Sequence, residues 1–473
     1  MNQKVKELLN TVLTEKNITF LLGAGASAPF FSSLGNLENV LTYDGINENG
    51  KRLIKSIFYN KSISKNEYLL EYLKDELSSS DSDTEKQMLS ILFQYKRFIH
   101  NILEYLKVRN SRVSPKRANI ITTNYDLFIE AAIDDILEDN PRVHFNDGTN
   151  GYIKRILQTD NFNKTLLYSG IFDNYSNEMP TINLIKCHGS VNWKEYSSLQ
   201  DSKKRIQIQM TTDKISELNQ MIDSLFDEMD SFLAEEEENL DYLLLLAEDV
   251  AELLDDEEPE SIKGDINLIG DSFEVELLEI SKKMEQIQIV YPTKKKFEST
   301  LVNEYYFGLL RLLSYELEKE QSTLVVFGFS FYDEHITEIV QRSLNNPNLL
   351  VIIFCYTNDN RDTIISNFNF TDNSIPNNVQ FVMPNDFVLE EIDTESYKKK
   401  YDDIKMEKSN IIYGTESVTV FDEIVSFVKT EKKNEYCILD FNSLNTILES
   451  EISNKYLDKN FLDLVNEDGD YFG

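Results

Sequence analysis

The sequence predicts an α/β protein built around an open parallel β-sheet. Short apolar runs without alternation recur along the chain, which is typical of strands buried on both faces. Helical patterns, with apolar residues three and four positions apart, separate these runs, so that strand and helix alternate. The length of 473 residues allows two to four domains, or one large domain with insertions.

Six apolar runs are the expected strands, and five segments between them are the expected helices. The strands are Ile18–Leu22, Asn119–Thr123, Ile182–Lys186, Leu324–Gly328, Leu350–Tyr356 and, as an edge strand, Val379–Met383. The helices are Leu37–Leu41, Gln87–Leu106, Tyr125–Leu137, Glu304–Leu317 and His335–Leu344. Because these elements belong to one alternating series, residues 1–390 are expected to form one domain.

A strongly acidic segment interrupts the series. Residues 213–285 hold 25 Asp or Glu and 4 Lys, a charge of −21 within a total of −35. Apolar residues recur at helical spacing over 218–233 and again over 240–254, so residues 200–290 are expected to be an acidic helical insertion, folded as a hairpin. Two interpretations stay open, a solvated insertion that packs on its own core and an arm that binds a basic partner. Direct nucleic-acid binding is not expected of so acidic a chain.

Residues 391–473 carry a different pattern and are expected to form a small C-terminal unit without an assigned role. The N-terminus lacks an apolar signal core, and the longest apolar runs are too short to span a bilayer. Cys187, Cys355 and Cys437 are too far apart in sequence for a disulfide framework or a CxxC zinc site. We therefore expect a cytoplasmic protein without membrane or metal binding.

Small or polar residues follow each of the first four expected strands. They are Gly23–Ser27, Asn124–Asp126, Cys187–Ser190 and Gly328–Ser330. Ligands of open parallel sheets bind at the carboxyl ends of strands, so these four turns are expected to converge on one crevice.

Each turn has a functional and a structural interpretation. Gly23 permits a tight turn and Gly25 a close approach to a pyrophosphate, but such glycines also occur in purely structural turns. His188, one of four histidines, is suited to be a general base near neutral pH, although a lone histidine is more often structural. Asn124 and Asp126 are suited to hold a water or a ribose hydroxyl, or else to cap the following helix.

The four turns together resemble the sirtuin (Sir2) superfamily, and more closely the Sir2-like domains of bacterial antiviral defence proteins. The resemblance lies in Phe20–Ser27, Ile120–Asp126, Lys186–Ser190, Tyr291–Lys294 and Val325–Asp333, which occur in the family's order. It covers about residues 15–385, apart from the acidic insertion.

The resemblance implies a Rossmann-like sheet of the sirtuin type with NAD as the bound substrate. It implies that NAD phosphates and ribose contact Gly23, Ala24, Gly25, Ser27 and Thr123, and that the adenosine half contacts Gly328 and Ser330. Asn124 and Asp126 would hold the nicotinamide ribose and the attacking water, and His188 would be the catalytic base.

Four departures from the family argue against protein deacylation. The four-cysteine zinc module is absent, and the sequence has no counterpart of the aromatic-rich strand that pairs with the acyl-lysine peptide. Thr123 stands where the family has Gln before the catalytic Asn, and Pro29–Ser33 replaces an Asp-Phe-Arg cluster. The resemblance therefore implies an NAD hydrolase without zinc, which releases nicotinamide and ADP-ribose in anti-phage defence. Activation by homo-oligomer assembly or by a partner, such as a HerA-like ATPase or an Argonaute-type protein, would be expected.

Three other functions are weighed against hydrolysis. A non-catalytic NAD or ADP-ribose sensor would use the same turns, and a deacylase is the second alternative. The third alternative, an ordinary dehydrogenase-like NAD(P) protein, would not explain the turns that contain Asn124 and His188.

Overall fold

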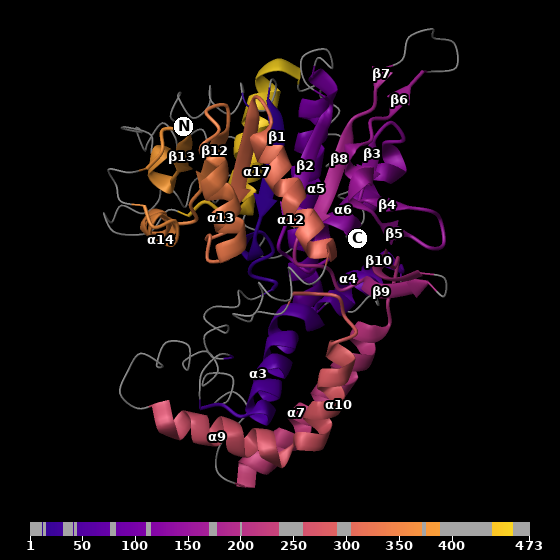
Figure 1. The fold of residues 1–473 in the computed structure, drawn as a ribbon, viewed down its shortest axis with the longest axis vertical. Helices are drawn as coiled ribbons and strands as arrows, with labels where there is room; N and C mark the ends of the chain where they lie inside the picture. The colour runs from indigo at the N-terminus through magenta and orange to yellow at the C-terminus, as the bar shows by residue number, and fades with distance from the viewer. Residues whose placement is uncertain are drawn as a thin grey trace, which may run out of the picture.

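The computed structural model describes residues 12, 16–31, 41, 45–75, 82–109, 115–169, 177–198, 201–235, 259–290, 304–370, 375–387 and 438–456. At its centre lies a seven-stranded, fully parallel sheet in the order β13-β12-β11-β1-β2-β8-β3 (Figure 1). The strands are β1 (Asn17–Leu22), β2 (Arg117–Thr122), β3 (His144–Asn146), β8 (Thr181–Lys186), β11 (Ser322–Phe327), β12 (Leu350–Phe354) and β13 (Val379–Val382). The predicted α/β class and all six predicted strands are confirmed, with β13 at an edge. Strand β3, at the opposite edge, was not predicted.

The register of the sheet brings four strand ends into one row. Leu22 of β1 pairs with Phe327 of β11 on one side and with Thr122 of β2 on the other, and Thr122 pairs with Lys186 of β8. The turns that follow these four strands therefore leave the sheet at the same edge. Chain order reverses between β1 and β11, which is the place where open α/β sheets bind ligands.

Helices cover both faces of the sheet (Figure 1). One face packs on α5 (Asp83–Val108), α6 (Phe128–Asp139) and α17 (Phe441–Tyr456), and the other on α12 (Glu304–Glu318), α13 (Glu334–Ser343) and α14 (Asn360–Asn367). Alternate strand residues point to opposite faces, so Phe20 and Leu22 lie in the first core and Leu21 in the second. The predicted helix Leu37–Leu41 lies outside the described residues, apart from Leu41, as does Tyr291–Lys294.

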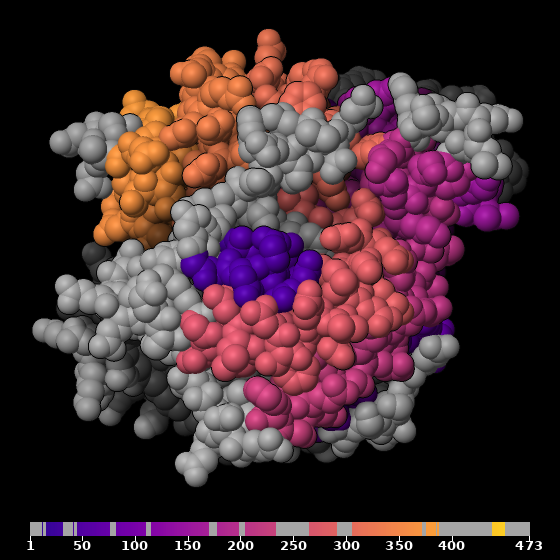
Figure 2. All heavy atoms as spheres, turned by 60° about the horizontal axis from the view of Figure 1, so that its bottom comes forward, coloured from indigo at the N-terminus to yellow at the C-terminus, as the bar shows by residue number. Residues whose placement is uncertain are grey.

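The acidic insertion contributes α7 (Lys214–Glu235), α9 (Pro259–Ser272) and α10 (Glu274–Met284). These helices pack against an N-terminal group, which consists of α3 (Glu48–Tyr59), the π-helical turn η2 (Asn60–Ser64) and α4 (Asn66–Leu73). Figure 2 shows residues of the N-terminal group in indigo among the pink atoms of the insertion. The Asn47 amide donates to Asn267 Oδ1 at 2.8 Å, which ties α3 to α9. The described helices thus share their core with α3 instead of packing only on one another. The predicted helix over 240–254 lies outside the described residues.

Smaller elements complete the described part. An antiparallel sheet has the order β4-β5-β10-β9, and β6 pairs with β7. Their bounds are β4 (Thr149–Asn150), β5 (Ile156–Leu157), β6 (Leu167–Tyr168), β7 (Asn177–Glu178), β9 (Trp193–Ser198) and β10 (Asp201–Ile208). Short 3₁₀ turns are η1 (Ala24–Ala26), η3 (Thr159–Asn163) and η5 (Pro384–Phe387). No described helix combines the length and the apolar character that crossing a bilayer requires.

Of residues 391–473, the structure describes 438–456, and this part packs on the main sheet. The ring of Phe441 lies 4.8 Å from that of Tyr95 and 5.2 Å from that of Phe327. Arg97 of α5 donates to both carboxylate oxygens of Glu449, at 2.8 and 2.7 Å. Helix α17 is therefore part of the first core and covers the strands that carry the candidate site.

Candidate functional site

The turns after β1 and β11 pack backbone against backbone. The Gly25 amide donates to Gly328 O at 2.9 Å, and Gly328 has a φ of +65°. A Cβ on Gly23 would lie 2.4 Å from Gly328 O, and a Cβ on Gly328 would lie 2.5 Å from the Ala26 nitrogen. Glycine is therefore required at these positions by the contact between the two turns. This structural role accounts for the glycines without reference to a phosphate.

A hydrogen-bonded group, the Ser27 hub, joins the turns after β1 and β2. It consists of Ser27, Tyr95, Asn124 and Asp126. Asn124 Nδ2 donates to Gly23 O and to Ser27 Oγ, both at 3.0 Å. Ser27 Oγ donates to Asp126 Oδ2 at 2.7 Å and lies 2.8 Å from the Tyr95 hydroxyl, which serves as its donor. Among the described residues nothing donates to Asn124 Oδ1, so this oxygen is the atom of the hub that a ligand can use.

Asp126 lies deeper than Asn124 and has a structural part. Its Oδ1 accepts from the Phe128 amide at 3.2 Å, at the start of α6, whereas Asn124 does not cap that helix. Burial raises the pKa of the Asp126 carboxyl, and the Lys186 ammonium and the Ser27 hydroxyl oppose this rise. Only 6% of the surface of Asp126 is exposed, so its carboxylate is suited to hold Ser27 and Asn124 in position and not to contact a ligand.

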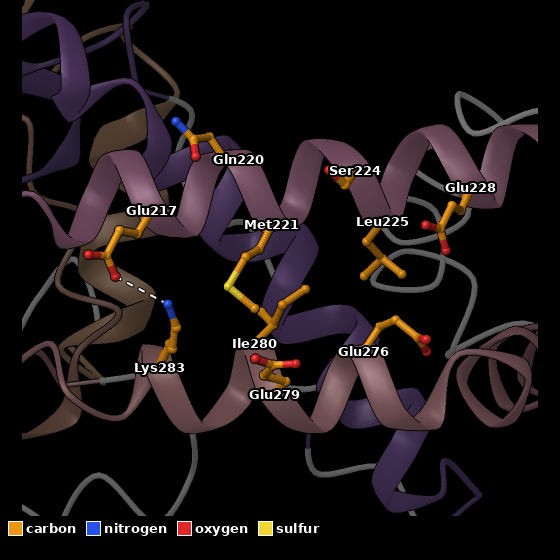
Figure 3. A pocket seen from close by; sticks show the side chains of 10 residues that line it. All are labelled: Glu217, Gln220, Met221, Ser224, Leu225, Glu228, Glu276, Glu279, Ile280 and Lys283. Carbon is orange, nitrogen blue, oxygen red and sulfur yellow. Dashed lines mark hydrogen bonds and ion pairs between the residues drawn. The ribbon is translucent and has the colours of Figure 1, made fainter.

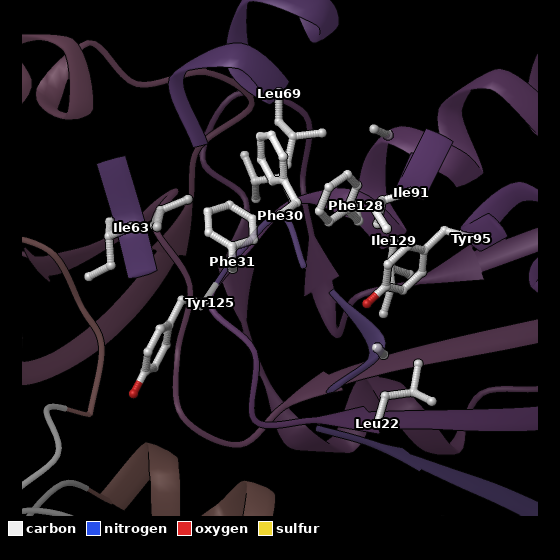
Figure 4. Close-up of a cluster of buried hydrophobic side chains, with 14 of the residues drawn as sticks. Leu22, Phe30, Phe31, Ile63, Leu69, Ile91, Tyr95, Tyr125, Phe128 and Ile129 are labelled. Atoms are coloured by element: carbon white, nitrogen blue, oxygen red, sulfur yellow. The ribbon is translucent and has the colours of Figure 1, made fainter. Parts of the chain in front are cut away.

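Aromatic rings from the segment after the Gly-rich turn belong to a cluster of buried side chains (Figure 4). Phe30 is fully buried, with its ring centroid 4.9 Å from Phe31 and 5.6 Å from Phe128. The Tyr95 ring stacks on Phe128 at 5.3 Å, which fixes the hydroxyl that donates to Ser27. The aromatic residues that follow the Gly-rich turn are therefore part of the core that supports the Ser27 hub.

A buried lysine joins the turn after β2 to the turn after β8. Lys186 Nζ lies 2.6 Å from Glu130 Oε1, donates to Ser190 Oγ at 2.9 Å and also donates to the Asp126 carbonyl oxygen. Burial raises the pKa of the Glu130 carboxyl, and Lys186 opposes the rise. Because Lys186 is 3% exposed, its charge acts inside the protein, where it compensates both carboxylates.

The imidazole of His188 lies at the N-terminus of α13, on the other side of the site. Its Nε2 is 3.1 Å from Asp333 Oδ2, and the side chains are 11% and 7% exposed. The His188 carbonyl oxygen accepts from the Val290 amide at 2.8 Å, at the exit from the acidic insertion. Burial raises the pKa of the neighbouring Cys187 thiol to about 12, so this thiol stays protonated and is not a nucleophile near neutral pH.

The other predicted contacts of NAD are less closely tied to the hub. Ala24 and Gly25 are exposed, and Thr123 is half-buried with its amide donating to Leu22 O at 3.3 Å. Ser330 is exposed, and its carbonyl oxygen accepts from Asn367 of α14 at 2.8 Å.

The sequence did not predict that four residues belong to this region, namely Tyr95, Glu130, Lys186 and Asp333. A polar residue directly before a helical pattern is a capping signal that singles out Asp333. A lysine that ends a buried strand is unusual enough to single out Lys186. Tyr95 and Glu130 lie within regular helical patterns, and nothing in the local sequence predicts that they contact the site.

A groove of about 420 Å³ lies away from these turns, between α7 and α10 (Figure 3). Its rim carries Glu217, Glu228, Glu276 and Glu279, with Lys283 Nζ 3.1 Å from Glu217 Oε2. None of the predicted NAD contacts lines it. In the described part of the chain, no three His, Cys, Asp or Glu side chains are grouped so that they could hold a metal ion.

The chain matches no protein-family model, and its sequence shows no similarity to a curated protein. Its function is therefore inferred from the arrangement of its own residues.

Proposed function

We propose that this protein hydrolyses NAD to nicotinamide and ADP-ribose at the edge where β1, β2, β8 and β11 end. One observation carries the proposal. An amide, Asn124, and an imidazole, His188, leave the same edge beside the Gly-rich turn, and hydrogen bonds run between their turns through Asp126 and Lys186. Opening a glycosidic bond with water needs a group that orients water, a base and a place for the dinucleotide.

The proposed reaction uses groups that the fold already holds in place. Asn124 Oδ1 accepts a hydrogen bond from the attacking water or from a hydroxyl of the nicotinamide ribose. The bond between ribose C1′ and the nicotinamide nitrogen breaks with its electron pair going to nicotinamide, and the water oxygen bonds to C1′. His188 takes the proton that the water loses. Ala24 and Gly25 are exposed at the strand end where a pyrophosphate would bind. The backbone amides of Gly25, Ala26 and Ser27 already donate to backbone oxygens of the two turns, so a pyrophosphate would have to displace some of these bonds.

Regulation by assembly is part of the proposal, because uncontrolled hydrolysis of NAD would be harmful to the cell. The acidic insertion supports it. The Gly189 turn, next to His188, forms an antiparallel bridge with Ile289, which lies at the C-terminal end of the insertion. A basic partner or a second copy of the chain that engages the insertion would therefore act on a segment in contact with the proposed base. A defence role and a HerA-like ATPase partner are the form of regulation that the family resemblance implies.

The test is NAD consumption by the purified protein, alone and with the product of the neighbouring gene. His188→Ala is expected to lower turnover by roughly 10²–10⁴-fold, the usual contribution of a positioned base. Asn124→Ala should also lose most turnover, because the water would no longer be oriented. His144→Ala is the matched control, since His144 lies on the edge strand β3. Full turnover in His188→Ala would show that the assignment is wrong.

A non-catalytic sensor of NAD or ADP-ribose is the second candidate, and two contacts favour it. The Gly25 amide is already used by Gly328 O, and Asp126 is committed to the Ser27 hub. Both groups already have hydrogen-bond partners within the protein, which leaves them less available to act on a reacting substrate. Calorimetry would separate the candidates, since a sensor would bind NAD without releasing nicotinamide in any condition tested.

A further inference from the structure

The tip of the β4–β5 hairpin carries the most exposed large apolar side chains of the described residues. Tyr152 is 98% exposed and Ile153 is 89% exposed. The tip is a tight turn, because Gly151 has a φ of +98° and a Cβ on it would lie 2.8 Å from the Lys154 carbonyl oxygen. A turn of defined shape therefore holds both apolar side chains in water, and a surface that covered them would be favoured by the hydrophobic effect.

The surface beside the tip is basic, although the whole chain has a net charge of −35. Lys154 Nζ lies over the ring of Tyr196 in β9, 5.5 Å from its centroid. Arg205 of β10 is paired with Tyr196, and Lys194 precedes Tyr196 by two residues, so both lie on the same face of the sheet. Glu195 lies between them in sequence and belongs to the opposite face. Lys154, Lys194 and Arg205 therefore place positive charge around the apolar tip.

The groove between α7 and α10 also offers apolar surface (Figure 3). Met221, Leu225 and Ile280 lie between the two helices, and Met221 is only half-buried. Val275 is 72% exposed and lies one helical turn before Glu279 on α10. The apolar floor of the groove therefore continues onto its rim.

The charge of the groove is opposite to that of the tip. Four glutamates and one lysine line it, which gives a charge of −3 near neutral pH. Glu217 is paired with Lys283, whereas no ion pair holds Glu228, Glu276 or Glu279 within the described part of the chain. An apolar segment that carries positive charge is therefore the occupant that this groove fits best.

We propose that the hairpin tip of one copy of this chain docks into the α7–α10 groove of a second copy. Tyr152 and Ile153 would cover the apolar floor and rim, and Lys154 would face the rim carboxylates. The tip does not line the groove of its own chain, and it stays exposed there. Because the chain itself carries both complementary surfaces, a second copy supplies the occupant that the charge and polarity of the groove require.

Docking at the groove would reach the proposed catalytic side through α10. The segment after α10 includes Ile289, which bridges to Gly189, and Val290, whose amide donates to the His188 carbonyl oxygen at 2.8 Å. The regulatory meaning of this connection rests on the proposed hydrolysis of NAD. The association itself does not depend on that activity and is tested separately.

The contact is small, so the association should be reversible. Stable interfaces bury about 1,200–2,000 Å² in total, of which two side chains supply only a part. Sedimentation velocity of the full chain should show monomers at about 1 µM and dimers or larger species by about 200 µM, the range expected of a weak contact. Raising the salt concentration from about 0.05 to 0.5 M should weaken the association, because salt screens the charges that face each other.

Two double variants each remove one half of the contact. Tyr152→Ser with Ile153→Ser removes the apolar tip, and Glu276→Lys with Glu279→Lys reverses the charge of the rim. All four positions are exposed, so thermal melting should be nearly unchanged. Each variant alone should weaken the association by roughly tenfold or more. An equimolar mixture should again form dimers, because the first variant keeps an intact groove and the second an intact tip.

Matched controls make the same chemical changes elsewhere. Leu167→Ser removes an apolar side chain that is 64% exposed on β6. Glu318→Lys with Glu338→Lys reverses two exposed charges on α12 and α13. Both controls should associate as the wild type does.

Each outcome decides the proposal. Loss of association in both double variants and its return in their mixture support it. A wild type that is monomeric up to about 200 µM overturns it, since even a weak contact would be populated there. Wild-type association of either double variant overturns it, and so does a mixture that stays monomeric. A protein that associates through these surfaces without cleaving NAD would refute only the proposed function, and a monomer that cleaves NAD would refute only this contact.

Discussion

The two sides of the candidate site are held in different ways. On the side of β1 and β2, Ser27 bonds to Tyr95, Asn124 and Asp126, and buried aromatics support it from below. On the side of β8 and β11, the described side-chain partner of the His188 ring is Asp333. Several hydrogen bonds hold the first side together, so the loss of one of them should lower the free energy of unfolding. The second depends on one contact, so a change there should affect ring orientation and activity before stability.

Lys186 joins the two sides, and its removal should have the largest effect. Lys186→Met leaves the carboxylates of Glu130 and Asp126 without their buried cation, so the free energy of unfolding should fall by roughly 3–5 kcal/mol. Urea unfolding followed by circular dichroism measures it. The exposed pair of Lys204 with Glu195 is the control, because Lys204→Met should cost roughly 0–1 kcal/mol. Equal losses in the two variants would contradict a buried role for Lys186.

The contact between the β1 and β11 turns should be the next most sensitive place. Gly328→Ala places a Cβ 2.5 Å from the Ala26 nitrogen at a φ of +65°, so unfolding free energy should fall by roughly 2–3 kcal/mol. Gly264→Ala is the control, since no atom lies within 4 Å of its added Cβ on α9. That substitution should stabilise the protein by about 0.5–1 kcal/mol. A Gly328→Ala protein as stable as the wild type would mean that the turns can separate freely.

The redundancy of the Ser27 hub is tested by a double-mutant cycle. Ser27→Ala removes the hydroxyl that donates to Asp126 Oδ2 and accepts from Tyr95, both of which are buried, so the free energy of unfolding should fall by about 1–2 kcal/mol. Tyr95→Phe should cost less, and the two losses should not add, because both remove the same bond. Strictly additive losses, measured by urea unfolding, would show that the hub is not a single unit.

The smallest effect expected is a change in how stability depends on pH. Burial raises the pKa of Asp126, so its contribution to stability is complete below the ordinary aspartate range and is lost as pH rises through the folded-state pKa. Asp126→Asn cannot ionise and should therefore gain stability relative to the wild type as pH increases from about 4 toward neutrality. Thermal melting across that range measures the difference, with the exposed Asp160→Asn as control. A difference that shrinks with rising pH would contradict a raised pKa.

The strands and the residues at their ends follow from local pattern, and the six predicted strands are confirmed. The acidic insertion was recognised from its charge, but its packing on α3 was not, because α3 lies far from α9 and α10 in sequence. Residues 391–473 were predicted as a separate unit, whereas α17 packs into the core through Phe441. Nothing in the local pattern near Phe441 shows which distant rings it will meet.

For this protein, the sequence by itself determined the parallel α/β class and the candidate chemistry at the strand ends. Both are encoded by the hydrophobic period and by the residues that directly follow each strand. Tertiary structure alone decided that the glycines support one another and that Lys186 compensates two carboxylates. It also decided that Asp333 lies against His188. The physical reason is that these contacts join segments far apart in the chain, and only the folded sheet brings their strand ends into one row.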